Sequence, residues 1–227
     1  MKSIFRIILS FFALMFICSP NFHAADYYAR VMIVGDSGSG KTSLWKRIFE
    51  SGFDENENRS DTMLRKEITR NVDGREIQFN IWDTAGAEAY YNEVVAFSKD
   101  ANFVIIVHDT DKKFDASREQ YLEKLYSDVH EKIKSDGKIM LVGNKWDLRH
   151  QNIVNASKHQ SLIESVAKSS PCSFKMVSCK DNSGDIGGIV DYLCSACKKM
   201  ELYTNNPDDC FQKRFTVKPG SGICTLL

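Results

Sequence analysis

The sequence has no excess of charge of either sign, since its 227 residues include 30 Lys and Arg and 30 Asp and Glu. This balance argues against a bulk nucleic-acid-binding protein, which normally carries a basic surplus, so we expect no nucleic-acid partner. Proline and glycine are scarce, at 4 and 13 residues, which excludes a fibrous or linker-rich chain. The 43% of hydrophobic and 26% of charged residues are typical of a globular protein.

Cysteine is missing from a long central stretch, because the seven cysteines stand at positions 18, 172, 179, 194, 197, 210 and 224. The odd number and the gap argue against a disulfide framework and for a reducing compartment. Cys194 and Cys197 form a C-x-x-C pair, but no second ligand pair lies near it in the sequence, so we expect no zinc site. We interpret both as half-buried cysteines of a helix near the end of the domain.

A long hydrophobic span is also missing at the N-terminus. The apolar run from Ile7 to Ile17 suits the hydrophobic region of a signal peptide and is too short to cross a bilayer comfortably. We therefore separate residues 1–25 from the domain. Three hypotheses stay open for this segment: a secretory signal, an uncleaved membrane anchor, or an extension upstream of a true start at Met15.

The C-terminal residues 201–227 are predicted to be a flexible tail. The tail ends in Cys-Thr-Leu-Leu, a loose match to the C-a-a-X prenylation box in which Cys224 would carry the lipid and Leu227 favours a geranylgeranyl chain. The alternative is a free tail without modification. With a prenyl group, the protein is expected to bind a membrane from its cytosolic face, in conflict with a secretory signal at the other end.

Between these ends, residues 26–200 alternate between strand-like and helix-like segments. Strands are expected at 27–35, twice within 63–83 around the Asp73-Gly74 turn, and at 102–109, 138–145 and 173–178, and helices at 41–50, 116–134, 156–169 and 186–200. This order predicts a single α/β domain with a mostly parallel six-stranded sheet and helices on both faces. Such sheets bind ligands at the carboxyl ends of their strands.

The first motif follows the first strand and reads GDSGSGKT, residues 35–42. It is a complete phosphate-binding P-loop, in which backbone N–H groups cradle phosphates at a helix N-terminus. Lys41 can reach the β- and γ-phosphates, and the Thr42 hydroxyl can ligate Mg²⁺. The residues expected to bind phosphate are Gly35, Ser37, Gly38, Ser39, Gly40, Lys41, Thr42 and Ser43.

Three further motifs also follow strands. In IWDTAG, residues 81–86, Asp83 can hold Mg²⁺ through water and Gly86 can present its N–H to the γ-phosphate. In NKWD, residues 144–147, Asp147 can accept hydrogen bonds from N1–H and the 2-amino group of guanine, a donor pair that adenine lacks. The remaining contacts to the base are expected from Asn144, Lys145 and the SCK motif of Ser178, Cys179 and Lys180.

With these motifs in this order, residues 27–200 resemble the small GTPases of the Ras superfamily, and most closely the Rab family. Ser37 in the P-loop and Trp82 before DTAG are Rab-like. The resemblance implies a P-loop GTPase domain that binds GTP or GDP with Mg²⁺ and places Phe53 against the guanine. It further implies effectors that bind the switch regions, an exchange factor and a GTPase-activating protein, and a role as a switch in membrane traffic.

The sequence departs from the family at the residue after DTAG. The family has a glutamine there that orients the attacking water, whereas this chain has Ala87. Alanine has no group to hold water, so intrinsic hydrolysis is expected to be slower by roughly 10²–10⁴-fold. The first hypothesis is a switch with weakened hydrolysis, and the second is a scaffold that stays bound to GTP and binds effectors almost constitutively.

The first switch loop is the second departure. The resemblance implies a hydroxyl ligand to Mg²⁺ in this loop, for which Ser60 is the first candidate and Thr62 the rival. We therefore expect Thr42, Ser60 and Asp83 at the metal, and Lys41, Ser60 and Gly86 at the reacting phosphate. A P-loop kinase of small metabolites is disfavoured by NKWD, and His108 and His130 are expected to have structural roles.

Overall fold

Apolar segments form the strands of one sheet in the computed structural model, which describes residue 25 and residues 27–50, 64–72, 74–84, 86, 90–150, 153–169 and 172–200. The strands are β1 (Tyr27–Gly35), β2 (Leu64–Val72), β3 (Arg75–Asp83), β4 (Phe103–Asp109), β5 (Lys138–Asn144), β6 (Ser173–Ser178) and β7 (Ser183–Gly184). They lie in the order β2-β3-β1-β4-β5-β6-β7. Only β2 and β7 run antiparallel to their neighbours, so the sheet is mostly parallel.

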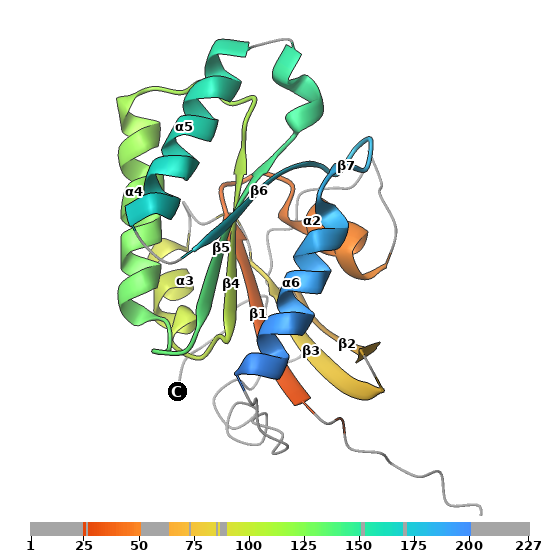
Figure 1. The fold of residues 1–227 in the computed structure, drawn as a ribbon. Coiled ribbons are helices and arrows are strands. Elements are labelled where there is room, and N and C mark those ends of the chain that lie inside the picture. Colours follow the sequence, from red (N-terminus) through yellow and green to blue (C-terminus); the bar gives the residue numbers. More distant parts are fainter. Residues whose placement is uncertain are drawn as a thin grey trace, which may run out of the picture.

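Helices cover both faces of this sheet, as a parallel sheet requires because its connections must cross over. The helices are α2 (Lys41–Phe49), α3 (Tyr91–Ser98), α4 (Ala116–Lys132), the short 3₁₀ helix η1 (Trp146–His150), α5 (Ile153–Ser169) and α6 (Ile186–Lys199). Figure 1 shows α2 and α6 on one face and α3, α4 and α5 on the other.

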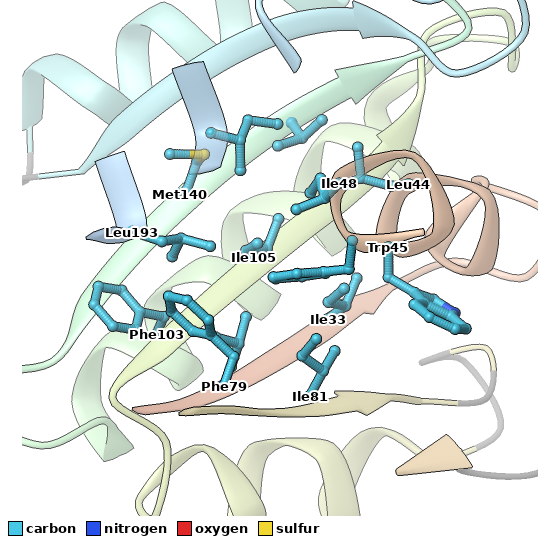
Figure 2. Close-up of a cluster of buried hydrophobic side chains, with 14 of the residues drawn as sticks. Ile33, Leu44, Trp45, Ile48, Phe79, Ile81, Phe103, Ile105, Met140 and Leu193 are labelled. Carbon is cyan, nitrogen blue, oxygen red and sulfur yellow. The ribbon is translucent and has the colours of Figure 1, made fainter. Parts of the chain in front are cut away.

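Alternate side chains of the central strands supply two cores, one under each helical layer. Ile33 and Ile105 point toward α2 and α6, where Phe79 and Leu44 are also fully buried (Figure 2). Met32 and other side chains of the opposite face pack under α3, α4 and α5. Burial of each such side chain stabilises the fold by about 1.5–3 kcal/mol.

The predicted architecture is confirmed, with a few additions. The two-residue strand β7 extends the six expected strands to seven, and α3 and η1 were not expected from the sequence. The helix expected at 156–169 begins earlier, at Ile153. One face of α4 is apolar and is buried at Leu122, Leu125, Tyr126 and Val129. Among the described residues, no helix is both long and apolar enough to cross a bilayer.

The sheet order brings the predicted motifs to one edge. The register pairs Gly35 of β1 with Val107 of β4, and Asp109 of β4 with Asn144 of β5. Strands β1, β3, β4, β5 and β6 all run in the same direction, so their carboxyl ends, where the motifs begin, lie side by side.

Candidate functional site

The P-loop connects β1 to α2 through a backbone that only glycine adopts easily. Gly35, Gly38 and Gly40 have φ angles of 144°, 75° and 89°. A Cβ on Gly35 would lie 1.9 Å from the carbonyl oxygen of Val107, so the close approach of two neighbouring strands also requires glycine there. The loop leads directly into α2, whose first turn contains no acidic side chain. The N–H groups at this end of the helix therefore favour a bound anion.

Lys41 lies at the start of α2 and its side chain folds back over the loop. It is buried, and its Nζ donates hydrogen bonds to the carbonyl oxygens of Gly35 at 3.1 Å and Asp36 at 2.8 Å. These contacts hold the ammonium group inside the ring of loop backbone. A positive charge in that place suits the β- and γ-phosphates of a nucleotide.

Thr42 and Asp83 meet where α2 begins and β3 ends. The Thr42 hydroxyl donates to Oδ2 of Asp83 at 2.6 Å, and Asp83 is only 2% exposed. A hydroxyl and a carboxylate beside a phosphate-binding loop are the hard oxygen donors that Mg²⁺ prefers. The two residues therefore fit the predicted metal site, with Thr42 as a direct ligand and Asp83 acting through water.

Gly86 lies against the P-loop. A Cβ on Gly86 would come within 2.9 Å of Cβ of Ser37 and within 3.0 Å of its backbone nitrogen. Any side chain at position 86 would push the two segments apart. The contact places the end of the DTAG motif beside the loop, as expected for an N–H that meets the terminal phosphate.

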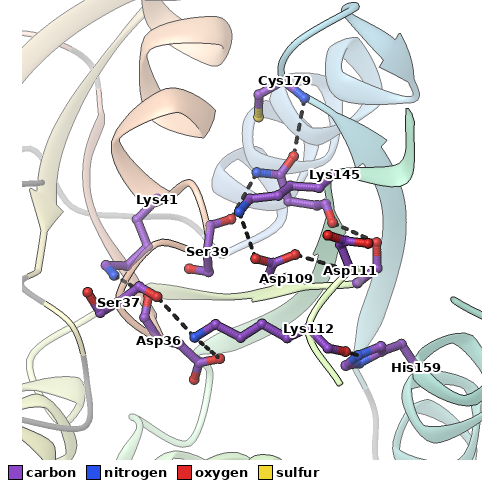
Figure 3. Close-up of polar contacts among 12 residues, drawn as sticks. Asp36, Ser37, Ser39, Lys41, Asp109, Asp111, Lys112, Lys145, His159 and Cys179 are labelled. Atoms are coloured by element: carbon purple, nitrogen blue, oxygen red, sulfur yellow. Dashed lines mark hydrogen bonds and ion pairs between the residues drawn. The ribbon is translucent and has the colours of Figure 1, made fainter. Parts of the chain in front are cut away.

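Asn144 connects the phosphate-binding half of the site to the half predicted to bind the base. Its side chain is buried, donates from Nδ2 to the Ser39 carbonyl at 2.9 Å and accepts at Oδ1 from the Cys179 backbone N–H at 3.2 Å. Figure 3 labels Ser39 and Cys179, the two residues that this amide joins. A Cβ on Gly40 would lie 2.2 Å from Nδ2, so the amide can approach only because residue 40 is glycine.

The NKWD and SCK motifs meet through side chains. Oδ1 of Asp147 accepts a hydrogen bond from Oγ of Ser178 at 2.6 Å, which fixes the orientation of the carboxylate. Lys145 has a φ of 65°, and its Nζ donates to Oδ2 of Asp109 at 2.7 Å. These contacts fix the positions of Lys145 and of the Asp147 carboxylate, the two side chains predicted to bind guanine.

Two residues that support this half were not predicted from the sequence. Arg47 of α2 donates to the backbone carbonyls of Cys179 at 2.7 Å and Lys180 at 3.0 Å, and so ties the SCK loop to the helix that follows the P-loop. Asp109 accepts a hydrogen bond from Lys145 and holds it in place. The position of Asp109 at the end of a buried strand is the sequence feature that could have indicated this role. Cys179 contributes its backbone N–H and carbonyl to these contacts. Burial raises the pKa of its thiol to about 12, so the thiol stays protonated.

Several predicted site residues lie outside the described residues. These are Phe53, Ser60, Thr62, Ala87 and Cys224. Ser43 is described and lies in the first turn of α2, half-buried. The P-loop, DTAG, NKWD and SCK motifs are therefore together at one edge, and the contributions of the first switch loop, of residue 87 and of the tail stay predictions.

A pair of histidines lies behind the site. His108 of β4 stacks on His159 of α5 with ring centroids 5.1 Å apart, and Phe114 meets the same His159 ring edge-on at 4.8 Å. Burial, together with the neighbouring His159, lowers the pKa of His108 to about 3, so its ring is neutral near pH 7. Burial also lowers the pKa of His159. His130 is exposed and stacks on Tyr126.

The C-x-x-C cysteines lie on α6 as expected, more deeply than half-buried. Cys194 and Cys197 are 6% and 0% exposed, and both thiols are free. Burial raises the pKa of Cys197 to about 12, which keeps its thiol protonated and unreactive.

Comparison with known proteins agrees with this geometry. A model of the Ras family matches residues 30–191. The Ras-related protein Rab-8B of Dictyostelium discoideum is 27% identical over 187 residues, which cover 82% of this chain and 88% of the relative. The Ras-related protein Rab-1D of the same organism is 29% identical over 141 residues, covering 62% of this chain and 67% of the relative.

Proposed function

The chain belongs to the Ras family, with Rab proteins among its relatives, and on this premise we propose that it is a guanine-nucleotide switch in membrane traffic whose intrinsic GTP hydrolysis is weak. The observation that carries the proposal is the Asn144 amide, which joins the Ser39 carbonyl of the P-loop to the Cys179 N–H of the SCK loop. One buried side chain thereby joins the two segments that we propose to bind phosphate and guanine.

In this proposal each half of the site has a distinct task. The Lys41 ammonium and the start of α2 bind the phosphates, and the Thr42 hydroxyl and Asp83 hold Mg²⁺, which would neutralise charge on the β- and γ-phosphates. Asp147, oriented by Ser178, accepts from the guanine edge and excludes adenine, whose edge lacks the matching donors. Binding of the γ-phosphate by Gly86 would order the surface that effectors recognise.

Weak hydrolysis follows from Ala87, which cannot position the attacking water. Single-turnover GTP hydrolysis by residues 26–227 tests this part. Ala87→Gln should raise the rate by about 10²-fold or more, because it restores the water-positioning amide. Ala89→Gln adds the same side chain two positions later and should leave the rate unchanged. An Ala87→Gln rate equal to that of the wild type would remove the basis for weak hydrolysis.

The alternative is a scaffold that stays bound to GTP, and Ala87 is also the observation that favours it. Chromatography of the nucleotide that co-purifies with the protein separates the two. Bound GTP with almost no turnover supports the scaffold, whereas bound GDP with measurable turnover supports the switch. In either case we propose action at the cytosolic face of a membrane through a prenyl group on Cys224. Mass analysis of the C-terminal peptide from the native source would detect or exclude that group.

A further inference from the structure

A buried carboxylate lies inside the phosphate-binding loop and is contacted by two cations. Asp36 follows the first glycine of the P-loop and is 0% exposed. Oδ2 of Asp36 forms an ion pair with Nη1 of Arg118 from α4, and Nζ of Lys112 lies 3.7 Å from the same oxygen. A carboxylate so close to bound phosphates would repel them unless it were compensated.

The two cations differ in position. The Arg118 side chain is only 11% exposed and compensates Asp36 from within the protein. The Lys112 side chain is 39% exposed, and its Nζ also donates to the backbone carbonyl of Ser37 at 3.1 Å (Figure 3). One negative and two positive groups leave a net positive charge in this cluster, and its accessible part is the Lys112 ammonium group at the surface of the loop.

The backbone of Lys112 is held in place independently of its side chain. Nε2 of His159 lies 2.9 Å from the Lys112 carbonyl oxygen, and because a carbonyl only accepts, this nitrogen carries the proton. His159 is in turn packed between His108 and Phe114. The segment after β4 is thereby fixed next to the P-loop, and the Lys112 side chain extends from it with Nζ beside the Ser37 carbonyl and the Asp36 carboxylate.

Ser37 is also the residue that Gly86 contacts. Lys112 therefore lies beside the stretch of the P-loop that faces the end of DTAG, where the terminal phosphate is expected. We propose that Lys112 supplies, within this chain, a positive charge that stabilises the terminal phosphate of GTP and the charge that develops on it during hydrolysis. This inference rests on the proposed function and deepens it.

The physical basis is the charge of the transition state. In the transition state of phosphoryl transfer, negative charge is spread over the oxygens of the γ-phosphoryl group, and cations placed beforehand near those oxygens lower the barrier. A chain with Ala87 in place of the water-positioning glutamine depends more heavily on such charge. Lys112 would also favour GTP over GDP, because only GTP carries the terminal phosphate.

The test uses the full chain and three variants, Lys112→Met, Lys112→Arg and Lys113→Ala. Lys113 is the matched control, because it is the adjacent exposed lysine and its removal changes the net charge equally. Lys112→Met should lower the single-turnover hydrolysis rate by about 10- to 100-fold. It should also weaken binding of a non-hydrolysable GTP analogue more than binding of GDP. Lys112→Arg should stay close to the wild type, and Lys113→Ala should change neither quantity.

The outcomes separate this inference from the proposed function. A wild-type chain that binds no guanine nucleotide overturns the proposed function itself. A wild type that binds GTP while Lys112→Met and Lys113→Ala behave alike, in rate and in the ratio of the two affinities, overturns only the role of Lys112. Where wild-type turnover is too slow to measure, the affinity ratio alone decides. Unfolding temperatures of the variants show whether an effect comes from lost structure.

Discussion

Replacement of Asp147 by asparagine should change which base the protein binds. The Asp147 carboxylate is oriented by the Ser178 hydroxyl at 2.6 Å. In the proposed site it accepts two hydrogen bonds, from N1–H and the 2-amino group of guanine. In Asp147→Asn the charge is lost, and the new amide NH₂ faces the 2-amino group, so that two donors meet without an acceptor.

The size of the effect follows from these contacts. Hydrogen bonds to a charged group contribute about 1.5–3 kcal/mol each, and a buried donor left without an acceptor costs about 1–3 kcal/mol. A total of about 3–5 kcal/mol corresponds to a loss of about 10²–10⁴ in affinity for GDP. Xanthine has a carbonyl where guanine has its 2-amino group, so the same variant should bind xanthosine diphosphate more tightly than the wild type does.

Fluorescence titrations with labelled GDP and xanthosine diphosphate measure both affinities. Ser178→Ala is the matched control, because it removes the contact that orients the carboxylate but keeps its charge. It should weaken GDP binding by about tenfold or less, without a change in base preference. An Asp147→Asn protein that binds GDP within threefold of the wild type and gains nothing for xanthosine diphosphate would refute the assignment of Asp147 to the base.

Four further predictions concern residues in and around the site. Asn144→Ala should lower both the unfolding free energy and the free energy of GDP binding by about 2–4 kcal/mol, because the Ser39 carbonyl and the Cys179 N–H lose this partner. Denaturant titration measures the first quantity and nucleotide titration the second. A change in only one of them contradicts the proposal that Asn144 joins the two loops. Gly40→Ala should lower the free energy of unfolding, measured by thermal unfolding, by about 1–3 kcal/mol, because the φ of residue 40 is 89° and its new Cβ would meet Asn144. Gly187→Ala is the control in a helix, because the space around its Cβ is open. Arg118→Met should destabilise the protein by about 2–4 kcal/mol, because Asp36 loses its nearer cation and keeps the more distant Lys112. Addition of Asp36→Asn should restore much of the lost stability if the unpaired charge is the cause. Acidification should also destabilise the fold, because the pKa of His108 is about 3 in the folded protein against an ordinary value of 6.5, so the unfolded chain binds the proton first. The unfolding free energy present above pH 6.5 should fall by about 2 kcal/mol by pH 5. His108→Phe should reduce this dependence of the unfolding free energy on pH, and the control His130→Gln should not.

The fold could be predicted because hydrophobic patterning and loop motifs agreed. Strands such as β4 are apolar at nearly every position, which is typical of parallel strands covered on both faces. Each motif follows a predicted strand, and parallel sheets bind ligands at the carboxyl ends of their strands, so the sequence predicted that the motifs lie together. The helix α3 was missed because its eight residues are too short to show a clear helical period.

The contacts that hold the motifs together were harder to predict, because they join residues far apart in the chain. Arg47 lies in the last turn of α2, where an arginine is ordinarily a solvent-exposed residue, and nothing near it in the sequence indicates its hydrogen bonds to the SCK loop. The pairing of Asp36 with Arg118 likewise depends on the placement of α4 over the P-loop. Sequence patterns locate elements, whereas such pairings depend on how the elements are oriented in space.

The approach of Asn144 to Gly40 also bears on how sequences of this kind can diverge. A Cβ at position 40 would come within 2.2 Å of Nδ2 of Asn144, so Gly40 cannot be exchanged while Asn144 keeps its amide. A lineage that lost the glycine would first have to accept a shorter side chain at position 144, and would pass through an intermediate that lacks the bond to the Ser39 carbonyl. We therefore expect the two positions to be inherited as a unit, although they belong to different motifs, which are proposed to bind opposite ends of the nucleotide.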